Sequence, residues 1–537
     1  MKNPPINNRF TLSRGLHVLV LTVLVLGIFF RFVNLDKKIF WGDESFTSVH
    51  VAGYTSLELN QNFYSGQIIG IEDLQKYQGA NYERSLSDKI KSLENDVHPP
   101  LYYLILIFWS QCFGSSVSVI RSLSALISLL AFPCIYWLCL ELFESPLVGW
   151  IAIALIAVSP FHVLYAQEAR MYSLWTVTIL LSSIALLRAI RLQTKVSWGL
   201  YTLTLTLGLY SFLFTGFVGI GHGIYVFVNE RFRFSRTFFS YLLASVVSIL
   251  AFAPWLGIMI ANRSDFQAAT AWSTQDMSLL SLVVNWIYNL SYVFVDFFYI
   301  FTYFPESPFN WRFGKYVIPL VLILTGYSIY LLCSQTQIRT WWFVLTLIGS
   351  TALAVILPDL ISGGYRSIMA RYFIPCYIGI ELAVAYLLAT QINSVKISQQ
   401  QLGKILVITL LSAGIISCVI SSQSETWWNK RTTSYDQLQV ARIINKSTNP
   451  LFLTENLFTT LPLTHKLDSK VKFLVAHESD KTKIPESFNK IFLYRPSKKW
   501  QDKLEKEKNY KLDIVYQGRK LDLWQLEKVN LLRGSNK

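Results

Sequence analysis

The stretch NLDKKIFWGDESFTSVH, residues 34–50, is the part of the chain around which the rest is organised. It begins where the first long apolar run, residues 15–33, ends, which is where a membrane-spanning helix would leave the bilayer. Asp43 and Glu44 lie side by side in it. Adjacent acids are most often solvated surface, but a carboxylate at a membrane exit is placed to act as a general base on reactants from both bilayer and water. Asp43 and Glu44 are therefore the first candidate catalytic residues.

The composition predicts a multi-pass membrane protein. Of the 537 residues 52% are hydrophobic and only 15% are charged, which is too apolar for an ordinary soluble enzyme. The first apolar run is followed by no small-residue cleavage site, so we expect it to remain as an uncleaved helix. The net charge of +15 is concentrated in the C-terminal tail, which suits contact with anionic lipid headgroups. Nucleic acid is not an expected partner.

About eleven apolar segments are long enough to be candidate membrane helices. They are residues 15–33, 117–140, 147–163, 172–190, 198–213, 215–228, 238–260, 316–333, 341–357, 373–390 and 404–420. Residues 101–113 are apolar but short and follow two prolines, so we interpret them as an interfacial or partly inserted helix. Residues 261–315 could hide two further spans, which gives a range of 11 to 13.

The distribution of Lys and Arg predicts the orientation. With residues 101–113 not spanning, the basic connections all share one face with the N-terminus, which is therefore expected to be cytoplasmic. Four segments and the C-terminal tail then lie on the opposite face. The segments are residues 34–116, 162–171, 261–315 and 358–372.

The second and fourth external segments carry unusual charges. FHVLYAQEARMY places Glu168 and Arg170 at a helix end, where a simple surface ion pair is an equally good explanation. PDLISGGYRSIMARYF carries Arg366 and Arg371, and the tyrosines Tyr365 and Tyr372 flank this pair. Arginines outside the bilayer run against the orientation bias, so a specific anion is a plausible ligand for them.

The composition changes sharply near residue 423. Residues 434–446 have a helical pattern, residues 451–455, 472–476 and 490–494 read as short strands, and residues 512–526 read as a hairpin turning at 517–518. We therefore predict a membrane domain over residues 1–422, which includes the first external loop, and a small soluble α/β domain over residues 423–537. None of the six cysteines lies in this tail, and their spacing supports neither zinc nor a disulfide framework.

Several short motifs, in this order, resemble one family. They are DE at 43–44, HPPL at 98–101, VIRSLSAL at 119–126, QEARMY at 167–172 and RYFIP at 371–375. Together they resemble the polytopic glycosyltransferases of clan GT-C, of the protein O-mannosyltransferase and aminoarabinose transferase kind. The resemblance covers about residues 10–430 and rests on motif order and shared sidedness, since no single motif is specific.

The resemblance implies a reaction and roles for the residues. A sugar carried on a polyprenyl phosphate would be transferred outside the cytoplasm, with inversion, to a lipid, glycan or protein acceptor. Asp43 would be the base and Glu44 would assist or orient it. The donor phosphate would be bound by residues from several segments, namely Arg366, Arg371, Arg170, His98 and Tyr365. Four further residues would line the same cavity, namely Glu168, Arg121, Tyr102 and Tyr372. His98 replaces the lysine of the aminoarabinose branch, and a helix-capping role for it is equally open.

The resemblance also limits the cofactor and leaves an alternative function. Relatives that bind a metal use D-x-D, and no such motif stands in the first two external segments, so no cofactor is expected and a divalent metal would rest on Asp43, Glu44 and Glu168 alone. The alternative is a transporter or flippase of lipid-linked glycans. Transporters usually place ionisable residues in mid-span within paired halves, whereas these charges gather at one face. The resemblance places the protein in the plasma (inner) membrane, and donor sugar and acceptor are not readable from the sequence.

Overall fold

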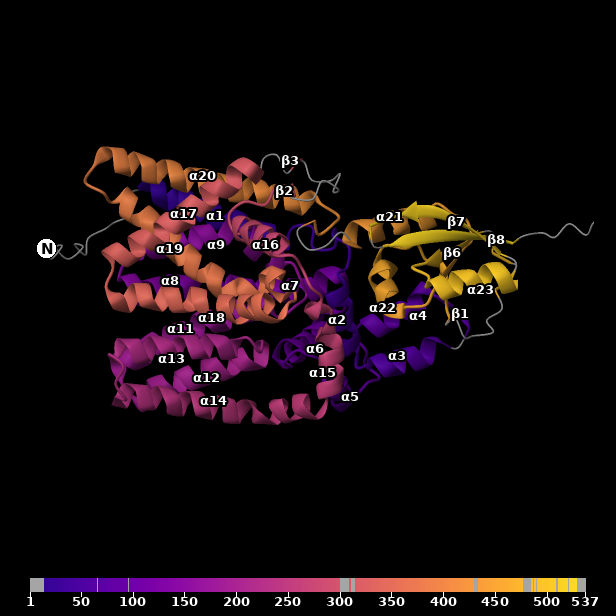
Figure 1. Cartoon of the computed structure of the whole chain (residues 1–537), viewed down its shortest axis with the longest axis horizontal. Helices are drawn as coiled ribbons and strands as arrows, with labels where there is room; N and C mark the ends of the chain where they lie inside the picture. Colours follow the sequence, from indigo (N-terminus) through magenta and orange to yellow (C-terminus); the bar gives the residue numbers. More distant parts are fainter. Residues whose placement is uncertain are drawn as a thin grey trace, which may run out of the picture. The chain divides into compact units, whose positions relative to one another are not determined.

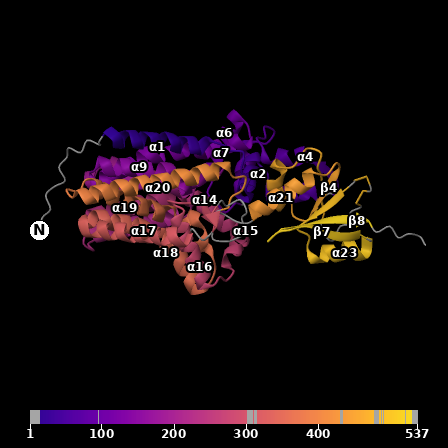
Figure 2. The ribbon, with the colours of Figure 1, turned by 90° about the horizontal axis from the view of Figure 1, so that it is seen from above.

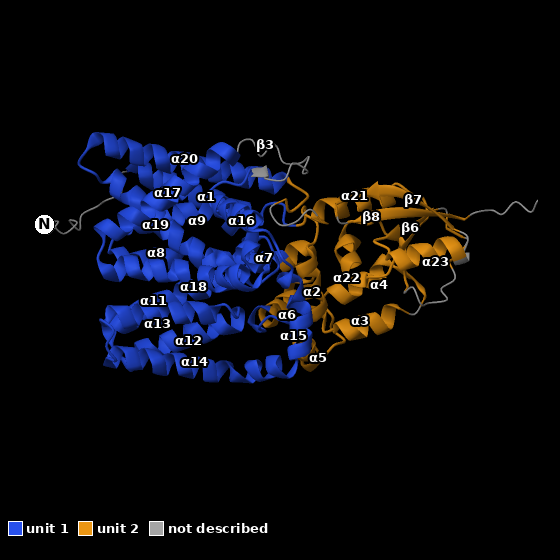
Figure 3. Cartoon of the chain, in the orientation of Figure 1, with its two compact units in different colours: residues 1–35, 94–102, 121–423 blue, residues 36–93, 103–120, 424–537 orange. Residues whose placement is uncertain are grey.

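The structure is a computed structural model of the whole chain. It describes residues 14–64, 66–94, 96–299, 309–310, 314–428, 433–476, 484–485, 487–488, 490–508, 510–519 and 521–528. The chain forms two compact units (Figure 3). Unit 1 comprises residues 1–35, 94–102 and 121–423, and unit 2 comprises residues 36–93, 103–120 and 424–537. The first external loop is thus largely grouped with the C-terminal residues and not with the membrane helices, where the sequence-based domain boundary had put it.

Helices that lie side by side, most of them long, make up most of unit 1 (Figures 1 and 2). They are α1 (Arg14–Phe32), α7 (Val117–Leu129), α8 (Ala131–Phe143), α9 (Pro146–Val158), α10 (Pro160–Ala166), α11 (Tyr172–Leu192), α12 (Lys195–Ser211), α13 (Thr215–Asn229), α14 (Arg236–Ala261), α17 (Gly314–Gln335), α18 (Ile338–Ser362), α19 (Ile374–Ile392) and α20 (Ile397–Gln423). Each of the eleven spans expected from the sequence coincides with one of these helices or with two consecutive ones.

Eight helical segments in the described part of the chain are long and apolar enough to cross a membrane, and α9 with α10 makes a ninth if this bent pair is one span. The helices α12 and α13 are shorter, with 17 and 15 residues, and pack among the others. The chain is a multi-pass membrane protein. The helix of residues 101–113, expected to be short and interfacial, is α6 (Leu101–Phe113), which is too short to span.

Helix α19 is the centre of the bundle. Its almost continuous apolar run is 94% buried, because α9, α17, α18 and α20 all pack against it. Gly379 allows the close approach of α18, since a Cβ at this position would lie 2.6 Å from the Ile348 side chain. A helix that is apolar all round must be covered on every face, which this packing achieves.

The helices α9 and α10 are separated by a sharp break. They meet at an angle of 60° at Ser159, and α10 begins with Pro160. A proline lacks the N–H that would continue the hydrogen-bond ladder of the preceding helix, and it is favoured at a helix start. The Ser159 hydroxyl donates to the carbonyl of Val293 at 2.6 Å, which anchors the break. The bend directs α10 into residues 167–171, where the candidate residues Glu168 and Arg170 lie.

The third external segment contains no spanning-length helix in its described residues. It forms α15 (Arg263–Thr270), η2 (Ala271–Thr274), α16 (Leu279–Ser291) and the two-residue strands β2 (Phe298–Tyr299) and β3 (Phe309–Asn310), which pair in parallel. The fourth segment follows α18 through Gly363 and Gly364, with φ of 75° and 120°. The positive φ of Gly363 is a backbone conformation that glycine adopts without strain, and a Cβ there would also meet the Asp276 side chain. The segment continues as η4 (Arg366–Ile368) and η5 (Ala370–Phe373).

Unit 2 is built on a six-stranded mixed sheet in the order β1-β5-β4-β6-β8-β7. Its strands are β1 (Ile68–Gly70), β4 (Pro450–Thr454), β5 (Lys472–Val475), β6 (Lys490–Tyr494), β7 (Tyr510–Gln517) and β8 (Asp522–Lys528). Strands β4, β5 and β6 are parallel, whereas β7 and β8 form an antiparallel hairpin on β6. All the C-terminal strands and the hairpin expected from the sequence are confirmed. The edge strand β1 comes from the first external loop and pairs antiparallel with β5.

The remaining helices of unit 2 come from the first external loop and from the C-terminal residues. They are α2 (Gly42–Ala52), α3 (Ser56–Phe63), α4 (Ile71–Gln75), η1 (Lys76–Gln78), α5 (Leu86–Leu93), α21 (Thr433–Asn445), α22 (Leu457–Thr460), η6 (Leu461–His465) and α23 (Lys498–Lys508). Trp500 and Leu504 of α23 pack on Leu453 and Leu493 of the sheet. The helix expected over residues 434–446 is α21.

Candidate active site

The carboxylates Asp43 and Glu44 lie in the first turn of α2, in unit 2. The side chain of Asp43 is partly buried, whereas that of Glu44 is completely buried. The first turn of a helix carries unsatisfied N–H groups and the positive end of the helix dipole, so it favours negative charge. Both acids therefore stand in the turn of α2 where a helix favours negative charge.

Glu44 has a structural role within α2. Its Oε2 accepts a hydrogen bond of 2.8 Å from the backbone N–H of Trp41, the residue that precedes the helix. This return of the third helical residue to the N-cap backbone is one half of a capping box. Asp43 lies outside this cap, and its backbone carbonyl accepts the Thr47 hydroxyl at 3.0 Å. Glu44 therefore fixes the start of the helix on which Asp43 is presented.

In unit 1, His98 and Arg170 are brought together from segments 72 residues apart. The guanidinium Nη2 of Arg170 lies 3.0 Å from Nε2 of His98, and Nδ1 of His98 lies 2.8 Å from Oδ1 of Asp96. The same Nη2 lies 3.2 Å from Nδ1, so it is almost equally far from both ring nitrogens and lies over the imidazole ring. Asp96 thus orients His98, and His98 orients Arg170. Arg170 is 2% exposed.

Further hydrogen bonds hold the segment that carries Arg170. The Ser124 hydroxyl donates to the carbonyl of Arg170 at 3.2 Å, and the Tyr102 hydroxyl lies 2.7 Å from Ser124 Oγ, so Tyr102 donates to it. The Gln167 amide donates to the carbonyls of Phe30 and Val33 at the end of α1, at 2.8 and 3.1 Å. Tyr102, predicted to lie in the cavity, is fully buried and supports Arg170 through Ser124.

Arg371 lies among aromatic rings. Its guanidinium carbon is 5.8 Å from the centre of the Tyr172 ring and 5.5 Å from that of Tyr372, which are cation–π distances. The ring of Phe212 lies 6.0 Å from Tyr172, 6.1 Å from Tyr372 and 6.1 Å from His98. Phe212 therefore connects Arg371 with the pair of His98 and Arg170. We call the six residues the cation–aromatic cluster, namely His98, Arg170, Tyr172, Phe212, Arg371 and Tyr372.

Arg366, five residues before Arg371, has a different environment. Its Nη1 lies 3.4 Å from Oδ1 of Asp359, a buried carboxylate near the end of α18, and 30% of its side chain is exposed. The other oxygen of Asp359 accepts the backbone N–H of Ser367 at 2.7 Å. The Tyr365 ring packs against Trp272 at 5.6 Å. Arg366 is therefore tied to the turn that follows the two glycines.

The two other predicted residues of unit 1, Arg121 and Glu168, are also buried. Arg121 is 1% exposed, and its Nη1 donates to the carbonyl of Leu35 at 2.6 Å. Glu168 is completely buried two residues before Arg170. Within the described ranges, no three His, Cys, Asp or Glu side chains lie close enough together to hold a metal ion.

Sequence reasoning missed three residues that organise these groups, namely Asp96, Phe212 and Asp359. Asp96 stands two residues before His98, and this spacing could have indicated its contact. Asp359 is an acid in an otherwise apolar helix end, which is a recognisable signal for a buried partner. Phe212 had no signal, because nothing distinguishes it from the many other aromatic residues of the membrane helices.

A family model described as dolichyl-phosphate-mannose-protein mannosyltransferase matches residues 97–258. This range includes His98, Arg121, Glu168, Arg170 and Phe212. No curated protein sequence matches the chain.

Two solved structures of one protein match the fold over almost the whole chain. ArnT from Cupriavidus metallidurans bound to undecaprenyl phosphate is 11% identical with a TM-score of 0.53, and the match covers 96% of this chain and 98% of ArnT. The apo state is 12% identical with a TM-score of 0.51, covering 95% and 98%. At this identity the likeness shows the fold. The chain therefore has the fold of ArnT, as expected from its resemblance to the GT-C glycosyltransferases.

Proposed function

We propose that this protein transfers a sugar from a polyprenyl-phosphate-linked donor to an acceptor outside the cytoplasm. The fold and the family match support a membrane glycosyltransferase, and ArnT of the same fold has been solved with undecaprenyl phosphate bound. The observation that carries the donor class is the cation–aromatic cluster, in which Arg170 and Arg371 come from segments about 200 residues apart in a multi-pass protein. Guanidinium groups bind phosphate oxygens with two parallel hydrogen bonds, and in a membrane protein the phosphate of a lipid is a suitable ligand for them.

The proposed reaction is a single displacement at the anomeric carbon. An acceptor hydroxyl forms the new bond to that carbon as the bond to the phosphate oxygen breaks, and the electron pair leaves with the polyprenyl phosphate. The acceptor proton goes to the Asp43 carboxylate, which acts as general base. One displacement inverts the configuration. Because the phosphate is a good leaving group, it needs cationic stabilisation and not protonation, which is the role proposed for Arg170 and Arg371.

The remaining candidates act through these groups. The imidazole ring of His98 holds Arg170, and Tyr102 holds the same segment through Ser124. Tyr372 stacks beneath Arg371, and we assign Arg366 and Tyr365 to the flank of the phosphate site. Arg121 and Glu168 belong to the wall of the cavity. The protein is proposed to lie in the plasma membrane with its N-terminus in the cytoplasm and with unit 2 on the external side.

Binding and transfer by the full-length protein in lipid nanodiscs test this function together. We expect native mass spectrometry to show a polyprenyl phosphate retained by the wild type, and a panel of polyprenyl-phosphate sugars to include one that is consumed. Anionic phospholipid at equal concentration is the control for headgroup charge alone. Binding of the phospholipid as tightly as the polyprenyl phosphate, with no donor consumed, would contradict the proposal.

A further inference from the structure

Arg31 is a charged residue buried inside the helical bundle. It lies near the end of α1 and is 1% exposed. Its guanidinium donates to the carbonyls of Ile156 and Ala157, at 3.0 and 2.6 Å, and to Ser128 Oγ at 3.1 Å. Those carbonyls lack helical partners because α9 ends at Val158, before the proline that begins α10. Arg31 therefore caps α9 at the bend, and none of these partners neutralises its charge.

A second buried ionisable pair lies on the neighbouring helices. Nε2 of His162 on α10 is 2.9 Å from Oε2 of Glu381 on α19, and the two side chains are 7% and 1% exposed. The other oxygen of Glu381, Oε1, has no hydrogen-bond partner among the residues that the structure describes. A carboxylate in an apolar span is costly unless a positive charge compensates it. His162, which bonds to Glu381, lines the same small cavity as Arg31, so a cation lies across this cavity from the partner of the carboxylate.

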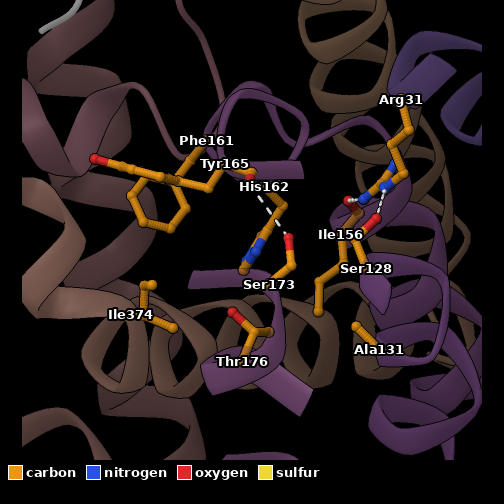
Figure 4. Close-up of a pocket in the computed structure, with 10 residues that line it drawn as sticks. All are labelled: Arg31, Ser128, Ala131, Ile156, Phe161, His162, Tyr165, Ser173, Thr176 and Ile374. Carbon is orange, nitrogen blue, oxygen red and sulfur yellow. Dashed lines mark hydrogen bonds between the residues drawn. The ribbon is translucent and has the colours of Figure 1, made fainter. Parts of the chain in front are cut away.

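A small cavity separates Arg31 from His162 (Figure 4). Both side chains line it, together with the hydroxyl residues Ser128, Ser173 and Thr176. Its volume of about 10 Å³ is close to the space that one water molecule requires. A water needs two to four polar partners, and the guanidinium, the imidazole and the hydroxyl groups supply them.

We propose that Arg31, His162 and Glu381 form one charge-compensated cluster, closed by a water molecule in the cavity, which positions the cation–aromatic cluster. His162 lies on α10 and Glu381 lies on α19. Each of these helices adjoins a segment that carries one arginine of the cation–aromatic cluster. Helix α10 runs directly into the segment of Arg170, and η5 with Arg371 runs directly into α19. The positioning role rests on the proposed function, whereas the charge compensation does not.

A double-mutant cycle tests the compensation without any activity assay. We expect Arg31→Met and Glu381→Gln each to lower the melting temperature of the protein in nanodiscs by roughly 5 °C or more, because each leaves a buried charge uncompensated. The double variant should lose clearly less than the sum of the two. Its matched control combines Glu381→Gln with His222→Phe, since His222 is also buried but bonds to Tyr201 on α12. Losses in the control should add.

Additive losses in the Arg31 and Glu381 cycle would overturn the compensation. An experimental map that resolves water is expected to show a peak between Arg31 and His162, and a collapsed or empty cavity there would overturn the water's part. Both results are independent of catalysis, so a wild type without transfer activity would refute the proposed function and leave the cluster intact.

Kinetics test the positioning role. We expect Glu381→Gln to reduce kcat/KM for the polyprenyl-phosphate sugar about tenfold, because a small displacement of phosphate-binding groups is costly to the transition state. His222→Phe should leave kcat/KM close to the wild-type value even where its melting temperature falls as far. An equal kinetic loss in the two variants would show that Glu381 acts only through stability, and the positioning role would then be rejected.

Discussion

The two units hold candidate site residues of opposite charge in different ways. In unit 2, Glu44 is held by a hydrogen bond to a residue three positions away, within one helix that also presents Asp43. In unit 1, Arg170 is held by His98 across 72 residues, and Arg371 lies against the ring of Tyr172, which comes from another segment. The carboxylates therefore depend on local structure, whereas the cations depend on tertiary packing. A substitution among the carboxylates should change chemistry more selectively than one among the cations.

The largest effect is expected for Asp43→Asn. This substitution keeps the size of a partly buried side chain and removes the base, so turnover should fall by roughly 10²- to 10⁴-fold. Donor affinity and melting temperature should stay close to the wild type, because Asp43 is not the residue that caps α2. Single-turnover transfer and donor binding measured on the same preparation separate the two quantities. Comparable turnover in the Asn variant would remove Asp43 from the role of base.

A smaller loss, on the order of tenfold to a hundredfold in kcat/KM, is expected for Arg371→Ala. Donor affinity should fall as well, because the guanidinium would contact the phosphate before and during transfer. Arg371→Lys keeps the charge but loses the planar group that packs on Tyr172 and Tyr372, so it should recover only part of the activity.

Arg366→Ala is the matched comparison for Arg371→Ala, since both arginines lie in one segment. Arg366 already pairs with Asp359. We therefore expect Arg366→Ala to melt at a lower temperature than the wild type and to lose less donor affinity than Arg371→Ala. Equal affinity in wild type and Arg371→Ala, or a full recovery by Arg371→Lys, would mean that the charge serves only anionic headgroups. Arg371 would then have no specific role in donor binding, and the comparison between the two units would no longer apply to the arginines.

The smallest effect is expected for Glu44→Gln. Glutamine is accepted at this position of a capping box, so the helix start should persist and turnover should fall only a few-fold. Glu44→Ala removes the cap as well and should lower the free energy of unfolding by about 1–2 kcal/mol. Thermal unfolding and turnover of both variants distinguish the two roles. If Gln reduces turnover as strongly as Asp43→Asn does, Glu44 is more than a helix cap.

The helices and the C-terminal strands were predictable because their signals are local. An apolar run of spanning length and a period of two in short strands depend only on neighbouring residues. For this reason all eleven expected spans coincide with helices, and β4, β5 and β6 occur where the sequence predicts them. The range left open for residues 261–315 reflects α16, a helix of 13 mostly apolar residues that resembles part of a span.

The candidate site was predictable as a set of residue types and not as an arrangement. The motif order pointed to His98, Arg170 and Arg371, which the structure connects through Phe212. The same reasoning treated Arg366 and Arg371 as equivalents, because they share a segment and a charge. Their difference depends on Asp359, and no pattern in the segment reveals that contact.

Hydropathy and strand patterns are properties of short stretches, so the amino-acid sequence is enough to identify this chain as a multi-pass membrane protein with a small α/β region after residue 423. Two pairings depend instead on the three-dimensional packing: β1 of the first external loop completes the sheet of that region, and His162 meets Glu381 from 219 residues away. A buried strand edge must be paired and a buried charge must be compensated, but many partners satisfy either requirement. The choice among them is made by the packing of the whole chain.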